Sequence, residues 1–288
     1  MKRQVVIAMT DEHAGSIGGL QNPETVLSVD EEVGRVEPVT PTPSAFQLTT
    51  WGYFESDLLG AFEFAGKDQV HIIKAGDVTQ GNRLSDGCKF TRMADQVELA
   101  LWNTLPILEF DNVASIRIDR GTGWHSFGEG SSEQLLASLI KGARPELDVK
   151  TVYHGLSIID GVRIDHSHHG PGTGSRDWLQ GNTGRYYLKD AVAKHRRNRD
   201  DNPPDVFIRG HVHGMIYETL HEVWRGKMCD YHLLTVPGYC GIGDYGRKAT
   251  KSTAFQQFGL VAFEIIDGEV GRIKNFFRTI DTRRWEEI

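Results

Sequence analysis

Aspartate and histidine residues recur at the ends of predicted strands. Asp11 and His13 follow the apolar segment VVIAM, and Asp77 follows VHIIKA within an Ala-Gly-Asp turn. One intervening residue lets Asp11 and His13 turn the same way and bind one cation, whereas a carboxylate with two oxygens can bridge two cations. Loops that follow strands are where α/β folds place their sites. These two segments therefore predict metal ligands.

Two further segments, both rich in histidine, lie in the second half of the chain. The first, DHSHHG, contains His168 and His169, and the second, RGHVHG, contains His211 and His213. In an extended His-x-His segment both imidazoles fall on one side, a geometry suited to two neighbouring metals. A glycine-flanked pair of histidines after an apolar strand is also poorly explained by packing.

The segment RGTGWH, which follows the strand IRID, places His125 in a loop. From its position alone, His125 is a candidate metal ligand, general acid or ordinary loop residue, and the sequence leaves the three open.

The types of these side chains favour a particular chemistry. Imidazole and carboxylate without thiolate favour Mn²⁺, Fe or Zn²⁺, whereas Mg²⁺ prefers oxygen ligands. Two cations about 3.5 to 4 Å apart would clamp a phosphoryl group and lower the pKa of a bridging water. The resulting hydroxide would attack phosphorus in line at neutral pH. The sequence thus predicts phosphoester hydrolysis with two divalent ions, Mn²⁺ first among them, as cofactors.

Alternating strands and helices are expected to position these loops. Helices separate the strands of the first half, which predicts parallel βαβ units, whereas the strand-rich second half predicts a more antiparallel sheet. Two mixed sheets packed face to face and flanked by helices would satisfy both. The expected helices are 44–65, capped by Ser44, 90–109, 131–142 and 180–197. The expected strands are 4–9, 70–75, 113–119, 149–154, 156–166 as a hairpin, 205–209, 215–223, 231–237, 258–265 and 271–278.

Length and composition indicate an ordinary globular chain. Its 288 residues are 39% hydrophobic and 25% charged, which predicts one domain, 1–288, with an insertion at about 22–66. Residues 22–43 are acidic and contain prolines, and they are expected to form an extended insertion beside the first strand.

Charge, cysteines and hydropathy exclude several classes of protein. A net charge of -7 disfavours broad adhesion to nucleic acid or anionic membranes. The three cysteines lack CxxC spacing, which indicates neither a disulfide framework nor a cysteine zinc site. We found no apolar stretch long enough for a membrane helix, and acidic residues appear too early for a signal peptide, so a cytoplasmic protein is expected.

The order of the motifs resembles the calcineurin-like metallophosphoesterase superfamily. Asp-x-His, Gly-Asp, Gly-x-x-x-His, His-His-Gly and Gly-His-x-His follow one another between residue 6 and about residue 214. RGTGWH, IDHSHHG and IRGHVHG are similar to segments of phosphoesterases encoded in phage and prophage genomes. The resemblance implies a four-layer α/β/β/α sandwich with a dimetal site at the tips of the central strands. It also favours a phosphodiester substrate, within a nucleotide or nucleic acid.

The resemblance also implies roles for individual residues. His125 takes the position of the general acid that protonates the leaving alkoxide, and His169 could exchange roles with its neighbour. The implied ligands are Asp11, His13 and His213 for one metal, Asp77 as the bridge, and His168 and His211 for the second metal.

Two departures from the family pattern weaken parts of this assignment. Where the family has Asn-His, this chain has Thr122 and then two residues before His125, so the amide ligand of the second metal is missing and Thr122 is a possible additional ligand. The family's second aspartate in GDxxD is Gln80, so His125 is expected to be a poorer proton donor. A phosphomonoesterase, a phosphoprotein phosphatase and a weakly active metal-bound scaffold protein are the alternatives.

Other residues near the motifs are expected to have different roles. Glu12 should stay out of the cluster, and His71 and His154 should be hydrogen-bonded structural residues. His166 should be structural or should contact a metal ligand. Trp51, Tyr53 and Phe54 have the spacing of core residues. Arg83, Arg209 and Lys248 are candidates to hold a phosphate oxygen, and Asp244 is a candidate to line the pocket.

Overall fold

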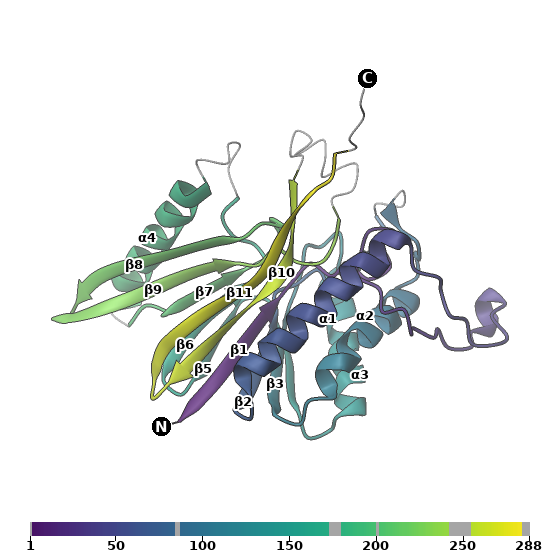
Figure 1. The fold of residues 1–288 in the computed structure, drawn as a ribbon, viewed down its shortest axis with the longest axis horizontal. Coiled ribbons are helices and arrows are strands. Elements are labelled where there is room, and N and C mark those ends of the chain that lie inside the picture. Colours follow the sequence, from purple (N-terminus) through teal and green to yellow (C-terminus); the bar gives the residue numbers. More distant parts are fainter. Residues whose placement is uncertain (1, 84–86, 173–179, 200–201, 242–254, 284–288) are drawn as a thin grey trace.

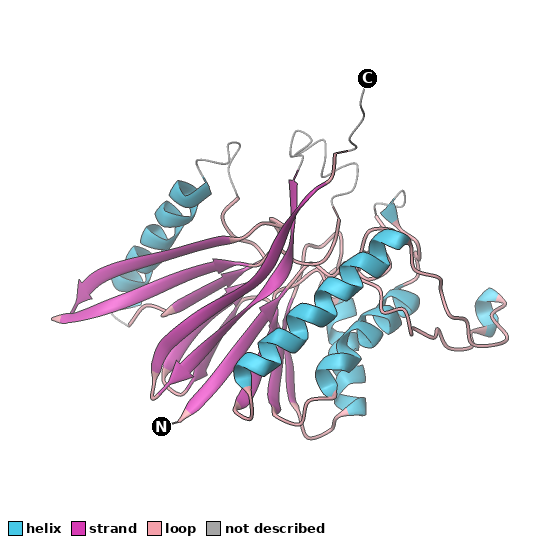
Figure 2. Cartoon of the chain, viewed as in Figure 1, coloured by secondary structure: helices cyan, strands magenta, loops and turns pink. Residues whose placement is uncertain are grey.

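The computed structural model describes residues 2–83, 87–172, 180–199, 202–241 and 255–283. Its strands form two mixed sheets, with helices on the outer face of each (Figures 1 and 2). The helices are α1 (Ala45–Ala65), α2 (Met93–Leu108), α3 (Ser131–Ala143) and α4 (Gln180–Arg199), with a short 3-10 helix, η1 (Glu31–Val33). The strands are β1 (Arg3–Met9), β2 (Gln69–Lys74), β3 (Val113–Asp119), β4 (Asp148–Val152), β5 (Gly155–Ile159), β6 (Val162–Ser167), β7 (Val206–Arg209), β8 (Ile216–Trp224), β9 (Lys227–Thr235), β10 (Phe255–Ile266) and β11 (Glu269–Asp281).

The six-stranded sheet has the order β11-β10-β1-β2-β3-β4, and the five-stranded sheet has the order β5-β6-β7-β9-β8. In the first sheet β1 to β4 are parallel neighbours, whereas β10 pairs antiparallel with β1 and β11. In the second sheet β6, β7 and β9 are parallel neighbours, whereas β5 and β8 pair antiparallel at the edges.

Alternation along β1 shows how the layers are built. Val5, Ile7 and Met9 belong to the core beneath α1 and α2, whereas Val6 and Ala8 belong to the core between the two sheets. Because successive side chains of a strand point to opposite faces, one apolar strand can serve both cores. The helix α4 covers the far side of the second sheet, against β8 and β9. The four-layer α/β/β/α sandwich predicted from the sequence is confirmed.

The predicted elements are all present, and two predictions about their arrangement were wrong. The α1 helix begins with a capping box in which Ser44 and Gln47 bond each other's backbone. Residues 22–43, however, pack along α2, where Asn22 bonds Asn103 and Arg35 pairs with Asp95. The strand-rich second half was expected to form a more antiparallel sheet, but its last two strands, β10 and β11, complete the first sheet. None of the described helices combines the length and apolar character needed to cross a lipid bilayer.

A buried carboxylate ties the edge of the first sheet together and should make stability depend on pH. The side chain of Glu264 is 3% exposed, and each of its oxygens lies 2.8 Å from an arginine Nε, one of Arg272 and one of Arg3. Hydrogen bonds from Arg272 and Arg3 lower the pKa of Glu264 from 4.5 to about 2. A lowered folded-state pKa stabilises the fold above the unfolded value, and the contribution is lost as pH falls from 4.5 toward 2.

We therefore expect Glu264→Gln to lower the free energy of unfolding by about 2 kcal/mol at pH 7 and by clearly less at pH 3.5. Urea unfolding of both proteins at the two pH values measures the difference. Glu269→Gln, at an exposed position of the neighbouring strand, is the control. A deficit of equal size at both pH values would contradict the prediction.

Candidate metal centre

The loops that follow β1, β2, β6 and β7 meet at one end of the two sheets. Asp11 lies two residues after β1, Asp77 three residues after β2, and His168 directly after β6. His211 and His213 follow β7. Because β1 and β2 are parallel, and β6 and β7 are parallel, the carboxyl ends within each pair point the same way.

The six predicted ligands form two adjoining groups. In the first, Nε2 of His13 and Nε2 of His213 lie 3.5 and 3.3 Å from Oδ1 of Asp11. The second group contains Asp77, His168 and His211, with His168 Nε2 only 2.9 Å from Asp77 Oδ2. Within each group the potential ligand atoms lie within 4.8 Å of one another.

Asp77 of the second group also faces the first group. His13 Nε2 lies 3.9 Å from Asp77 Oδ2, so one carboxylate oxygen faces both the first and the second group. The arrangement suits a carboxylate that bridges two cations, the role that the sequence predicts for Asp77.

Several donor atoms of the cluster have no hydrogen-bond partner. In the described part of the chain these buried atoms include Asp11 Oδ1 and His13 Nε2. Buried polar atoms are nearly always hydrogen-bonded, so convergent unpaired ones need an explanation. A cation coordinated by them would satisfy both. Imidazole and carboxylate donors without thiolate fit Mn²⁺, Fe or Zn²⁺, and the residues present thus fit the ions expected.

Backbone strain accompanies the cluster. Five of the six predicted ligands have a positive φ, which non-glycine residues rarely adopt. Strained residues persist where the surrounding structure forces them, commonly at functional sites. The values are 52° for Asp11, 45° for His13, 50° for Asp77, 72° for His211 and 48° for His213.

Backbone carbonyls orient two of the imidazoles. Nδ1 of His168 lies 2.7 Å from the carbonyl oxygen of Ala75, and Nδ1 of His213 lies 3.2 Å from that of Cys240. A carbonyl can only accept, so each Nδ1 carries the proton and each Nε2 faces the cluster. Metal-binding histidines in proteins are usually fixed in this way.

Asp77 and His168 shift each other's pKa in opposite directions. Burial would raise the pKa of Asp77, but His168 lowers it to about 2. Burial would likewise lower the pKa of His168, but the charge of Asp77 raises it to about 9. At neutral pH the pair is therefore an aspartate and an imidazolium, and a metal ion must displace the imidazolium proton to bind.

Thr122 and His125 occupy the loop after β3, and their contacts differ from the family pattern. The backbone N–H of Thr122 donates to Asp77 Oδ1 at 2.7 Å, so Thr122 orients the carboxylate. Nδ1 of His125 bonds the backbone oxygen of Gln80 at 2.6 Å, which takes the place of the missing carboxylate. Burial, followed by the charge of His13, lowers the pKa of His125 to about 4. Its Nε2 must therefore gain a proton before it can act as an acid.

The geometry distinguishes the two adjacent histidines after β6. His168 is 1% exposed and belongs to the second group, whereas His169 is exposed at the rim. The ring centroid of His169 lies 4.7 Å from that of His211. His169 is thus placed to line the approach to the cluster.

The residues set aside from the cluster lie outside the two groups. His71 bonds Gln4 and Ser115, and His166 bonds Asp119 at 2.6 Å. Glu12 pairs with buried Lys74. The contacts of the other residues agree with their expected structural roles: Trp51 and Phe54 are buried in the core, Tyr53 packs against it, and His154 bonds Asp165.

One of the three side chains predicted to hold a phosphate oxygen, Arg209, is buried and engaged by other residues. Arg209 is 2% exposed, and its guanidinium bonds Asp165 and Tyr187, so the prediction that it binds phosphate was wrong. The guanidinium of Arg83 lies over the ring of Trp124. Lys248 and Asp244 lie outside the described residues.

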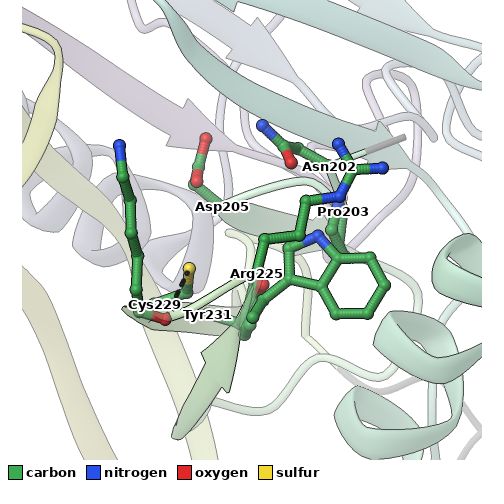
Figure 3. A pocket seen from close by; sticks show the side chains of 8 residues that line it. Asn202, Pro203, Asp205, Arg225, Cys229 and Tyr231 are labelled. Carbon is green, nitrogen blue, oxygen red and sulfur yellow. Dashed lines mark hydrogen bonds between the residues drawn. The ribbon is translucent and has the colours of Figure 1, made fainter. Parts of the chain in front are cut away.

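The sequence analysis missed a cavity beside the cluster. It has a volume of about 170 Å³ and shares His168 and His169 with the metal centre. The signal that could have revealed this cavity was Arg120. It follows β3 directly, in the same way as the predicted ligands follow their strands. The lining consists of Arg120, Tyr153, His154, Ser167, His168, His169 and Tyr187. A second cavity, of about 260 Å³, lies at the opposite end of β7 and β8, near Asp205 and Arg225 (Figure 3).

A glycine that touches Asp77 provides a test of the cluster. A Cβ at Gly121 would lie 2.0 Å from Asp77 Oδ1 and 2.4 Å from its backbone nitrogen, so Gly121→Ala must displace the aspartate. We expect the variant to lose at least tenfold in Mn²⁺ affinity, the lower end of the effects on metal sites when supporting contacts are lost. Isothermal titration calorimetry measures the affinity.

Gly123→Ala is the matched control for this variant. A Cβ at Gly123 would meet no atom closer than 3.9 Å, so the substitution should leave the affinity for Mn²⁺ unchanged. Equal affinities in the two variants would show that Asp77 does not contribute to the metal site.

Comparison with known proteins finds similar solved structures. The solved structure of the sulfate thiohydrolase SoxB of Thermus thermophilus, in complex with glycerol, is similar, with 13% sequence identity and a TM-score of 0.38. The match covers 98% of this chain and 57% of that chain, so this chain spans little more than half of SoxB. No protein-family model and no curated protein sequence matches.

Proposed function

We propose that the chain is a metal-dependent phosphoesterase that hydrolyses phosphodiesters at the cluster of aspartate and histidine side chains. The observation that carries this proposal is the pair of adjoining donor groups that meet at Asp77, whose Oδ2 lies 2.9 Å from His168 Nε2 and 3.9 Å from His13 Nε2. When bound, two divalent ions supply hydroxide at neutral pH and positive charge for the phosphoryl oxygens.

The proposed ligands follow the two groups. Thr122 holds the bridging carboxylate in position through its backbone N–H. The carbonyl oxygens of Ala75 and Cys240 hold the imidazoles of His168 and His213 with Nε2 toward the cluster. In this assignment Asp11, His13 and His213 would hold one ion, His168 and His211 would hold the other, and Asp77 would contribute to both sites.

His125 is the proposed proton donor to the leaving group. Its Nδ1–H donates to the carbonyl oxygen of Gln80, which leaves Nε2 facing His13 and Asp77. Burial and His13 lower its pKa to about 4, so only a small fraction of the protein has His125 protonated at neutral pH. This favours substrates whose leaving group needs little protonation.

Several finer predictions accompany this proposal. We propose Mn²⁺ as the preferred ion, a nucleotide or nucleic acid as the source of the phosphodiester, and a cytoplasmic, phage-type enzyme. The choice of ion rests on the chemistry of the imidazole and carboxylate ligands. The proposals on substrate, location and type of enzyme rest on the sequence.

Hydrolysis of chromogenic esters tests the proposal. The protein is stripped of metal, reconstituted separately with Mn²⁺, Fe²⁺, Zn²⁺ and Mg²⁺, and assayed with bis-p-nitrophenyl phosphate and p-nitrophenyl phosphate. We expect metal-dependent turnover, highest with Mn²⁺, and a preference for the diester. Faster turnover of the monoester would instead favour a phosphomonoesterase or phosphoprotein phosphatase.

The alternative of a metal-bound scaffold protein has one specific observation in its favour. Thr122 bonds Asp77 and offers no amide ligand to the second ion. An increase in melting temperature with Mn²⁺, but no ester hydrolysis with any of the four ions, would support the scaffold and refute the esterase.

A further inference from the structure

We propose that the cavity beside the metal cluster binds a second phosphate group of the substrate, next to the phosphodiester that is cleaved. This inference rests on the proposed function. It specifies the substrate class as a phosphodiester with a neighbouring phosphate, the arrangement that repeats along an oligonucleotide.

The first argument is Arg120, whose guanidinium has no partner among the described residues. The guanidinium of Arg120 lines the cavity, and the described part of the chain provides it with no ion pair or hydrogen bond. The side chain of Arg120 packs against Gly130, where a Cβ would lie only 2.7 Å from Arg120 Cδ. A guanidinium binds phosphate oxygens with two parallel hydrogen bonds. A half-buried arginine that makes no ion pair with the described residues is suited to an anionic ligand.

The second argument is the lining, in which the described residues include no carboxylate. Asp165, which contacts the lining residue His154 at 2.9 Å, is already paired with buried Arg209. Tyr187 accepts a hydrogen bond from Arg209 Nε at 2.8 Å, so its own hydroxyl proton remains available for a ligand. The cavity therefore presents hydrogen-bond donors and positive charge in a chain whose net charge is -7.

The third argument is size and position. Pockets that enclose a whole drug-sized ligand have volumes of roughly 300–1,000 Å³, whereas this one has about 170 Å³. It suits one group of a larger substrate. Because it shares His168 and His169 with the cluster, the group it holds lies beside the scissile phosphate.

Two substrates with one leaving group test the inference. Thymidine 5′-(p-nitrophenyl phosphate) is compared with the same ester carrying a 3′-phosphate, with Mn²⁺-loaded protein. We expect the 3′-phosphate to raise kcat/KM about tenfold, the size of one charge-assisted hydrogen-bonded contact. In Arg120→Gln the ratio of the two kcat/KM values should fall to about one.

Arg117→Gln is the matched control. Arg117 lies three residues earlier, on β3, and its guanidinium pairs with Asp148 at 2.5 Å, away from the cavity. This variant should keep the preference for the 3′-phosphate. Equal kcat/KM for the two substrates in the unaltered protein, or a preference that survives Arg120→Gln, would overturn the inference.

A binding measurement separates this inference from the proposed function. If neither ester is hydrolysed, calorimetry with thymidine 3′,5′-bisphosphate and metal-free protein still tests the cavity. Binding that Arg120→Gln weakens at least tenfold would retain the phosphate site while the esterase fails. Absence of binding, or equal binding by both proteins, would refute the site.

Discussion

Asp77→Asn should lower metal-dependent kcat/KM for bis-p-nitrophenyl phosphate by at least about 10³-fold, a loss of about 4 kcal/mol of transition-state stabilisation. Asp77 Oδ2 lies between the two donor groups, 2.9 Å from His168 Nε2 and 3.9 Å from His13 Nε2. An amide of the same shape has no negative charge and only one oxygen. Both proposed ions would therefore lose the carboxylate that they share.

Metal content separates this explanation from a folding defect. After dialysis against Mn²⁺ and removal of excess ion, the unaltered protein should retain about two ions per chain and the variant fewer. Asp111→Asn, at an exposed position just before β3, is the control and should change neither activity nor content. Full activity in Asp77→Asn would exclude a bridging role.

The layers of the fold were predictable because each follows from a local pattern. Val5, Ile7 and Met9 alternate with Val6 and Ala8, and both sets are apolar. A strand of this kind must be covered on both faces, so the sequence already implies helices on one side and a second sheet on the other.

The order of the strands was less predictable. In the first sheet β1 pairs with β10, so that Arg3 lies opposite Ile266. No local pattern specifies a partner that distant, and the pattern of β10 is compatible with either sheet. The buried contacts between Arg3 and Glu264 form only after that pairing and cannot be found by periodicity.

The candidate ligands were predictable because each is a side-chain type at a strand end. The supporting contacts were not, because they are made by the backbone. Gln80 was expected to alter the environment of His125 through its amide, yet the contact is its carbonyl oxygen. Thr122 was a possible additional ligand, yet its N–H orients Asp77. A motif identifies side chains, and any residue can supply these backbone groups.

The two arginines show the same limit for the pocket. Arg209 and Arg120 both lie at strand ends near histidine motifs, and the sequence favoured Arg209 for phosphate binding. The structure pairs Arg209 with Asp165, whereas Arg120 has no such partner among the described residues. The difference depends on which carboxylate a neighbouring strand presents, and that requires the register of β6 and β7.

Removing metal should lower the melting temperature by about 5 to 10 °C. A ligand that binds only the folded state at 100 times its Kd stabilises it by about 2.7 kcal/mol. In chains of roughly 150 to 250 residues, 1 kcal/mol corresponds to about 2 to 4 °C. Without cations, Asp11 Oδ1 and the two ring nitrogens of His13 have no hydrogen-bond partner among the described residues. Differential scanning fluorimetry with EDTA and then with excess Mn²⁺ measures the change.

His13→Ala distinguishes coordination from a general effect of salt. Neither ring nitrogen of His13 has a hydrogen-bond partner among the described residues, so its loss breaks no such bond in the metal-free protein. The variant should lose most of the gain in melting temperature on adding Mn²⁺. His221→Ala, which removes an exposed histidine paired with Asp230, should keep it. If the melting temperatures of the two variants rose equally with Mn²⁺, the ion would bind elsewhere. Of the two substituted histidines, only His13 belongs to the donor groups around Asp11 and Asp77.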